Sequence, residues 1–185
     1  MDRAGPEPHS QRDGPESCPV PDIPPAQAVI DNLPYLAMLL LGGGLFALAF
    51  RGTAGGLAAA AYVAYGLTGA LWIMLFVCPY CQFYGTRLCP CGYGQIAARL
   101  SPRQAHDGFR AQFRKHIPLL VPLWFLPLIP AAVSLMRHYS SPTLALLLAF
   151  VVNSFVVLPV VSRHYGCVKC PQQESCPWMG GCKHA

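Results

Sequence analysis

The sequence predicts an all-α integral membrane protein, a four-helix bundle of two antiparallel hairpins with cysteine-rich loops on the cytosolic side. Of the 185 residues, 54% are hydrophobic and only 11% are charged, a composition typical of membrane proteins. Crossing a hydrocarbon core takes about 20 mainly apolar residues, and four stretches without an internal charge approach or reach that length. They are Leu33–Phe50, Gly56–Val77, Ile117–Met136 and Pro142–Val161. Continuous apolar runs of this kind favour helices over the shorter, alternating strands of a barrel.

These stretches divide the chain into five segments. Residues 1–32 are rich in proline and acidic side chains, which predicts a disordered tail. Residues 33–77 and 117–162 form the two predicted hairpins. Between them, residues 78–116 are expected to hold a cytosolic cysteine loop and a basic interfacial helix, and residues 163–185 form a cysteine-rich cytosolic tail.

The positions of Lys and Arg predict the orientation, because positive residues in short loops favour the cytosol. The two short connections carry only Arg51 and Arg137. The remaining eleven basic residues lie in the tails and in the 78–116 loop. We therefore expect a multi-pass protein of the cell (inner) membrane with both termini in the cytosol. Orientation and anionic lipid headgroups account for the basic excess, so a nucleic-acid partner is not expected.

The segment SPRQAHDGFRAQFRK contains the predicted interfacial helix. Ser101 is a candidate N-cap followed by Pro102, and Phe109 and Phe113 fall on a different face from Arg110 and Arg114. The alternative is an ordinary solvent-exposed loop helix.

Four prolines in the third apolar stretch predict bends in that helix, which could open a pocket or serve packing alone. They are Pro118, Pro122, Pro127 and Pro130. We also expect Asn153 and Ser154 to bond across helices, and Gly66 and Gly69 to allow close helix approach.

Eight of the nine cysteines occur in two groups of four, CPYCQFYGTRLCPC and CVKCPQQESCPWMGGC, while Cys18 stands apart. The candidate metal ligands are Cys78, Cys81, Cys89, Cys91, Cys167, Cys170, Cys176 and Cys182. Four thiolates are the number that closes a [4Fe–4S] cluster or a structural zinc site. Disulfides are disfavoured because the predicted topology places all eight thiols in the reducing cytosol.

Irregular spacing interrupted by Cys-Pro favours two [4Fe–4S] clusters over two Zn²⁺ ions, because zinc ribbons usually separate two Cys-x₂-Cys pairs by a dozen or more residues. Zinc stays the alternative. Which four cysteines share each cluster is left open by the sequence.

One stretch of the first cysteine group resembles a known family. RLCPCGYGQIAARL, residues 87–100, is similar to the Cys-Gly-x-x-Cys-Pro-x-Gly-x-x-Gln stretch of membrane-integral polyferredoxin subunits, the quinol-oxidising proteins that accompany nitrate and nitrous oxide reductases. The resemblance implies a cytosolic iron–sulfur site near a quinone, and it carries over to Cys89, Cys91 and Gly94. The chain lacks the regular ferredoxin module of that family.

Together these observations predict a membrane-anchored electron-transfer subunit of an oxidoreductase complex, with no catalytic residues of its own. Electrons would pass between a cytosolic redox protein, such as a dehydrogenase or hydrogenase subunit, and the membrane quinone pool. His116 and His164 flank the cytosolic ends of the last two spans and are candidates for binding quinone or haem, or simple polar helix ends. The rival hypotheses are a zinc-stabilised membrane scaffold or assembly protein, and a thiol–disulfide oxidoreductase using Cys78/Cys81 or Cys167/Cys170.

Overall fold

The computed structural model describes residues 25–166, apart from 51 and 88, and this part of the chain is helical without β-strands. Four helical segments are long and apolar enough to cross a membrane: Ala26–Ala49, Thr53–Tyr80, His106–Arg137 and Ser141–His164. This confirms the predicted all-α class and the number of candidate spans. Cys18 and the second cysteine group lie outside the described residues.

The first two spans are the continuous helices α1 (Pro25–Ala49) and α2 (Thr53–Phe76), which pack along one another after the short connection at 50–52. α1 begins ahead of Leu33, where the apolar run starts, and so includes residues assigned to the N-terminal tail. The added turns contact the cysteine loop, where the Asn32 amide donates to the carbonyl of Cys91 at 2.9 Å.

The third span is a chain of short helices: α4 (Phe109–His116), η3 (Ile117–Leu120), α5 (Pro122–Phe125) and α6 (Leu128–Arg137). Each junction coincides with a proline, which removes a backbone donor. The fourth span comprises α7 (Ser141–Val152), η4 (Asn153–Val157), α8 (Leu158–Val161) and η5 (Ser162–Gly166), of which η4 and η5 are π-helical.

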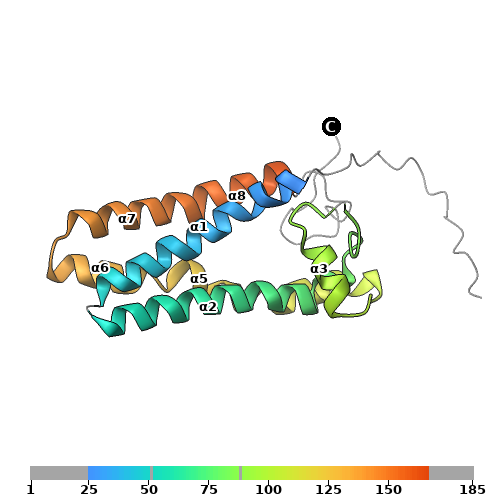
Figure 1. The fold of residues 1–185 in the computed structure, drawn as a ribbon, viewed down its shortest axis with the longest axis horizontal. Helices are drawn as coiled ribbons and strands as arrows, with labels where there is room; N and C mark the ends of the chain where they lie inside the picture. The colour runs from blue at the N-terminus through green and yellow to red at the C-terminus, as the bar shows by residue number, and fades with distance from the viewer. Residues whose placement is uncertain (1–24, 51, 88, 167–185) are drawn as a thin grey trace, which may run out of the picture.

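The helices run side by side along the long axis of the molecule (Figure 1). α1 contacts α2 on one side and α6, α7 and η4 on the other, while α2 meets η3 and α4 of the third span. α3 (Tyr93–Leu100) and its loop lie at one end, which we call the cysteine end, and the two short connections lie at the other.

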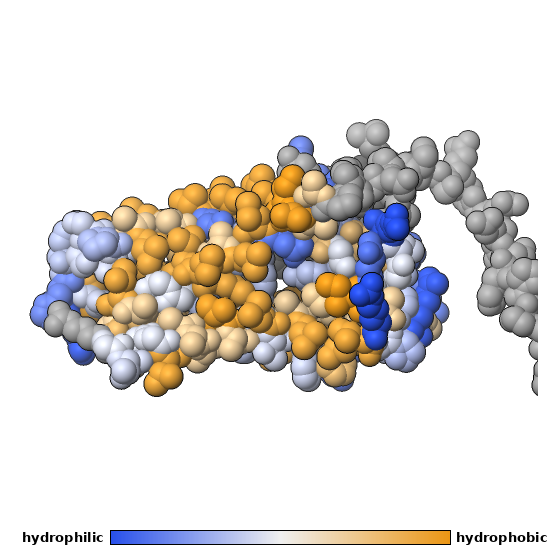
Figure 2. Space-filling model, viewed as in Figure 1, coloured by the Kyte–Doolittle hydropathy of each residue, from blue (hydrophilic) through white to orange (hydrophobic). Residues whose placement is uncertain are grey.

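The buried core is small, with three residues from α1, one from α2, two from the third span and one from the fourth. They are Met38, Leu39, Leu45, Tyr62, Leu123, Ala131 and Phe150. Many large apolar side chains point outward, among them Leu40 at 71% and Leu57 at 72% exposed. Figure 2 shows hydrophobic residues over much of the visible face of the bundle and strongly hydrophilic ones gathered at the cysteine end. Such a surface suits lipid rather than water.

Two expected close approaches are observed. A Cβ atom on Gly69 would lie 2.5 Å from Leu120 Cδ2, and one on Gly66 would overlap the side chain of Leu39. The amide of Asn153 bonds across to the carbonyl of Pro34 at 2.9 Å, as predicted. Ser154 also bonds across helices, but through its backbone. Its carbonyl accepts a hydrogen bond from Trp124 Nε1 at 3.1 Å, while its hydroxyl has no partner among the described residues.

The interfacial helix begins later than predicted. Ser101 is the C-cap of α3, with its N–H bonded to the carbonyl of Ala97 at 2.9 Å, and it therefore does not cap a following helix. Residues 102–105 run without helix before η2 (His106–Gly108), and α4 starts at Phe109. The Gln104 N–H bonds to the carbonyl of Pro79 at 3.0 Å, so this stretch is held against the cysteine loop instead of coiling.

Candidate functional site

The first cysteine group follows α2 directly. α2 ends at Phe76, and the 3₁₀ turn η1 (Cys78–Tyr80) places Cys78 and Cys81 one turn apart, with the Cys81 N–H bonded to the carbonyl of Cys78 at 3.0 Å. Both side chains are partly buried. Both thiols therefore lie directly after the helix of the second span.

Two glycines with left-handed backbone turn the chain back on itself. Gly85 and Gly92 both have φ of 73°, a conformation that costs other residues free energy. The Gly85 N–H bonds to the carbonyl of Gly94 at 3.0 Å, which closes the loop between them. α3 then packs against α2 and η1, bringing the later cysteines back to the first two.

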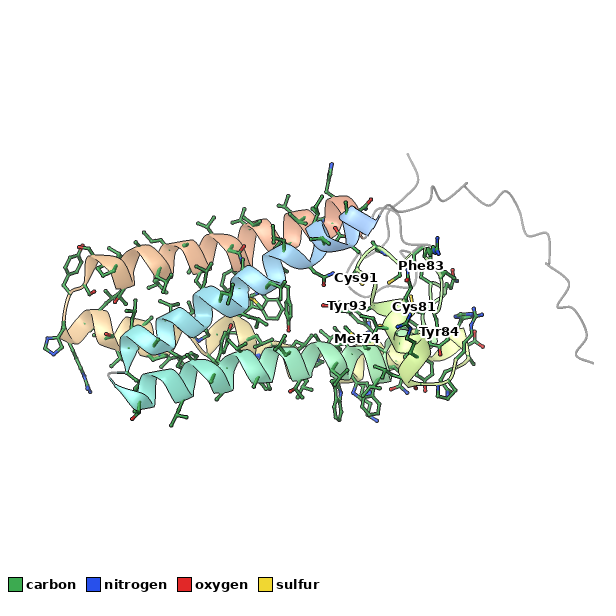
Figure 3. All side chains as sticks on the ribbon, viewed as in Figure 1. Met74, Cys81, Phe83, Tyr84, Cys91 and Tyr93 are labelled. Atoms are coloured by element: carbon green, nitrogen blue, oxygen red, sulfur yellow. The ribbon has the colours of Figure 1, made fainter. Side chains whose placement is uncertain are left out.

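Cys89 and Cys91 form a thiol pair, with their Sγ atoms 3.6 Å apart. The backbone N–H of Gly94, in the first turn of α3, donates to Cys89 Sγ at 3.3 Å. Figure 3 shows Cys81, Phe83, Cys91 and Tyr93 gathered in the loop and α3 at the cysteine end. Aromatic side chains therefore share this compact region with the thiols.

The thiols of Cys89 and Cys91 differ in pKa. A hydrogen bond from the Cys91 thiol, helped by the N–H groups of Gly94, Cys91 and Gly92, lowers the pKa of Cys89 to about 6 despite the opposing effect of burial. The same hydrogen bond, together with burial and the negative charge of Cys89, raises the pKa of Cys91 well above its ordinary value. One thiolate supported by backbone donors, beside one thiol, follows from this arrangement.

Gly94 is essential to this geometry. A Cβ atom there would lie 2.7 Å from the carbonyl oxygen of Phe83 and 3.4 Å from Cys89 Sγ. The absence of a side chain thus lets the start of α3 approach both the turn at Phe83 and the sulfur.

Neighbouring segments brace the loop. Asn32 of α1 donates to the Cys91 carbonyl, and the Tyr84 hydroxyl donates to the carbonyl of Ser101. A ring nitrogen of His106 lies 3.2 Å from the carbonyl of Tyr80. The site is therefore built from α1, the end of α2 and the segment that leads to α4.

The two predicted histidines occupy different settings. The Trp72 N–H donates to His116 Nδ1 at 3.1 Å, so Nε2 carries the proton and donates to Gln112 Oε1, also at 3.1 Å. The bond at Nδ1 thus joins α4 to α2, whereas the bond at Nε2 lies within α4. His164 lies in η5 on the fourth span, and its side chain is exposed.

A thiolate-bound metal centre fits part of this donor set. The paired sulfurs and the N–H donor to Cys89 are features of metal–thiolate sites. Within residues 25–166, however, no three His, Cys, Asp or Glu side chains are arranged to hold a metal ion. Cys167, Cys170, Cys176 and Cys182 lie outside the described residues, so the described part supplies a sulfur pair with two further thiols nearby.

Sequence reasoning found the four cysteines but not how they pair. The alternative dithiol was predicted at Cys78/Cys81 or Cys167/Cys170, and the close approach of the Cys89 and Cys91 sulfurs at 3.6 Å was not predicted. The Cys-x-Cys spacing was the available signal. The hydrogen bond from Asn32 to the Cys91 carbonyl could not be predicted from a local pattern, because the two residues are 59 apart in the chain.

Comparisons with known proteins add no family to this description. No family model, curated protein or solved structure matches the chain.

Proposed function

We propose that the protein is a membrane-anchored electron-transfer subunit that carries two [4Fe–4S] clusters and connects a cytosolic redox protein with the quinone pool. The observation that carries this proposal is the Cys89/Cys91 pair, with Sγ atoms 3.6 Å apart and an N–H donor from Gly94, at the end of a helix long and apolar enough to cross a membrane. Hydrogen bonds to sulfur are among the features by which proteins tune such centres.

When bound, such a cluster takes up and releases one electron at a time. Cys78, Cys81, Cys89 and Cys91 would hold the first cluster, and the second cysteine group would hold the other. Gly94 would stabilise negative charge on Cys89 through its N–H, while the aromatic rings of Phe83 and Tyr93 would limit contact with water.

The basic residues of the cysteine end support a cytosolic position. Arg87, Arg99, Arg103, Arg110, Arg114 and Lys115 are all exposed there. This surface suits anionic lipid headgroups and an acidic redox partner. Converting a quinone to a quinol would take two electrons from the reduced cytosolic protein and two protons from water at the membrane surface.

Metal analysis of protein purified without oxygen tests the proposal. We expect brown protein containing iron and acid-labile sulfide, with visible absorbance that dithionite bleaches. Cys89→Ser should remove most of the iron of one cluster, whereas the matched variant Cys18→Ser should leave the iron content unchanged, because Cys18 belongs to neither group. Colourless protein with stoichiometric zinc would instead establish the zinc-stabilised scaffold.

A second candidate function is thiol–disulfide exchange, favoured by the contact between Cys89 and Cys91. Here the Cys89 thiolate would attack a disulfide of a partner protein, and Cys91 would then displace the reduced partner thiol to leave a Cys89–Cys91 disulfide. The protein would thereby supply two electrons and the proton of Cys91, and water would supply the second proton.

Mass spectrometry of peptides from metal-free protein treated with an oxidised dithiol tests this candidate. Exchange predicts a Cys89–Cys91 disulfide that forms before any bond to Cys78 or Cys81. Protein that holds iron and resists this oxidation until the iron is removed would favour the electron-transfer function.

A further inference from the structure

An apolar cavity of about 430 Å³ lies between the third and fourth spans, in the half of the bundle toward the cysteine end. Aromatic rings make up much of its wall, together with aliphatic side chains and two serines. The lining residues are Phe113, Ile117, Leu120, Val121, Trp124, Phe125, Ser154, Phe155, Leu158, Pro159 and Ser162. The volume falls within the range of small-molecule sites, roughly 300–1,000 Å³.

Ser154, one of the lining residues, has a buried hydroxyl without a partner among the described residues. Ser154 is 0% exposed, and its Oγ makes no hydrogen bond within the described residues. A serine in a membrane helix usually bonds back to a carbonyl of its own helix, and leaving a buried hydroxyl unpaired costs free energy. This second observation, independent of the cavity, points to a ligand that accepts a hydrogen bond.

The backbone around Ser154 departs from the α-helix, and Pro159 explains its hydrogen bonding. Ser154 lies in the π-helical turn η4, where its carbonyl would ordinarily receive the N–H of residue 159, which is Pro159. Trp124 Nε1 supplies the missing donor at 3.1 Å. π-helical turns are frequent at functional sites, and here the turn and the indole together fix the cavity wall.

We propose that this cavity binds the ring of an isoprenoid quinone, with Ser154 as the hydrogen-bond donor to a ring carbonyl; the inference rests on the proposed electron-transfer function. Quinone rings are flat, apolar and carry two carbonyl acceptors, which matches aromatic walls with one free hydroxyl. The acyl chain of a phospholipid carries no hydrogen-bond acceptor, so it would leave the Ser154 hydroxyl unpaired.

The position of the cavity suits this role. One end is lined by Phe113 and Ile117, on either side of His116, whose ring stacks on Phe76 with centroids 5.4 Å apart. Phe76 ends α2, immediately before the cysteine loop. The cavity therefore extends toward the same end of the bundle as the thiols. Its outer residues, such as Val121 at 46% exposed, lie on the surface through which a quinone would enter from the lipid.

Photolabelling of the full-length protein in quinone-free lipid nanodiscs with an azido-quinone tests the proposal, with labelled peptides identified by mass spectrometry. We expect saturable labelling of residues 113–125 and 154–162, displaced by decylubiquinone. Val121→Trp should reduce this labelling at least tenfold by filling the cavity. The matched variant Val152→Trp, at a similarly exposed position outside the cavity, should leave it unchanged. Ser154→Ala should weaken quinone binding about two- to tenfold, the loss expected for one hydrogen bond.

The outcomes separate this inference from the proposed function because labelling does not require iron. Labelling at the cavity in a protein without iron would support the quinone site and contradict the electron-transfer function. Iron-containing protein in which labelling is unsaturable, spread evenly over all four spans, or unaffected by Val121→Trp would overturn the quinone site alone. Recovery of a phospholipid that decylubiquinone cannot displace would also overturn it.

Discussion

Single residues decide the shape of the cysteine loop, and Gly94 is the clearest case. Its N–H reaches Cys89 Sγ only because no side chain separates α3 from the carbonyl of Phe83. Gly92, just before α3, contributes in another way, by adopting the left-handed conformation that aims the first N–H groups of α3 at the sulfur. The Cys91 thiol and these backbone N–H groups together lower the pKa of Cys89 without a positively charged side chain.

Gly94→Ala should destabilise the loop by about 1–3 kcal/mol, because the added Cβ forces the start of α3 away from Phe83 and Cys89. Unfolding of purified protein in mixed detergent micelles measures the loss, and iron content reports whether the sulfur pair survives. Gly56→Ala is the matched control, since nothing lies within 4 Å of a Cβ at that position in α2. It should be neutral or stabilising by up to about 1 kcal/mol. Equal effects of the two changes would contradict the packing argument.

Among the elements, the broken third span depends on its neighbours for backbone hydrogen bonds. In an apolar environment every free carbonyl costs free energy, and prolines create such carbonyls. Pro127 removes the donor for Leu123, and the Tyr62 hydroxyl of α2 replaces it at 2.8 Å. Tyr65 donates similarly to Leu119, and Trp124 to Ser154. Tyrosine and tryptophan side chains thus supply the hydrogen-bond donors that the prolines remove from the backbone.

Tyr62→Phe should lower the free energy of unfolding by about 1–3 kcal/mol, because the Leu123 carbonyl is then buried without a donor. In a Pro127→Ala background the new N–H of residue 127 can bond that carbonyl, so the same change should cost distinctly less. A double-mutant cycle measured in detergent gives the coupling energy. Additive effects of the two substitutions would show that the hydroxyl stabilises the bundle in some other way.

At the scale of the whole molecule, the two ends differ in chemistry. Exposed basic side chains and four thiols lie at the cysteine end, whereas the opposite end consists of the two short connections. An apolar surface between two such ends suits a protein held at a fixed depth in a bilayer, with its thiols at one membrane face.

Topology mapping tests this orientation. Tags at both termini and in the 92–115 loop should report the cytosol, because the basic residues favour that side, while tags at Gly52 and Ser140 should report the outside. Antibody access to the tags, compared between intact and permeabilised cells, provides the measurement. A cytosolic signal from both short connections would contradict the orientation and, with it, the argument against disulfides.

The sequence by itself determined the all-α class, the four candidate spans and the grouping of cysteines beside them, because hydropathy and spacing are local properties. Only the tertiary structure decided where α1 and α4 begin, since Asn32 and Gln104 bond to the loop across long stretches of chain. It likewise decided that Cys89 pairs with Cys91 and that Ser154 lines a cavity. These features depend on which surfaces meet when the helices pack, and no local pattern encodes that.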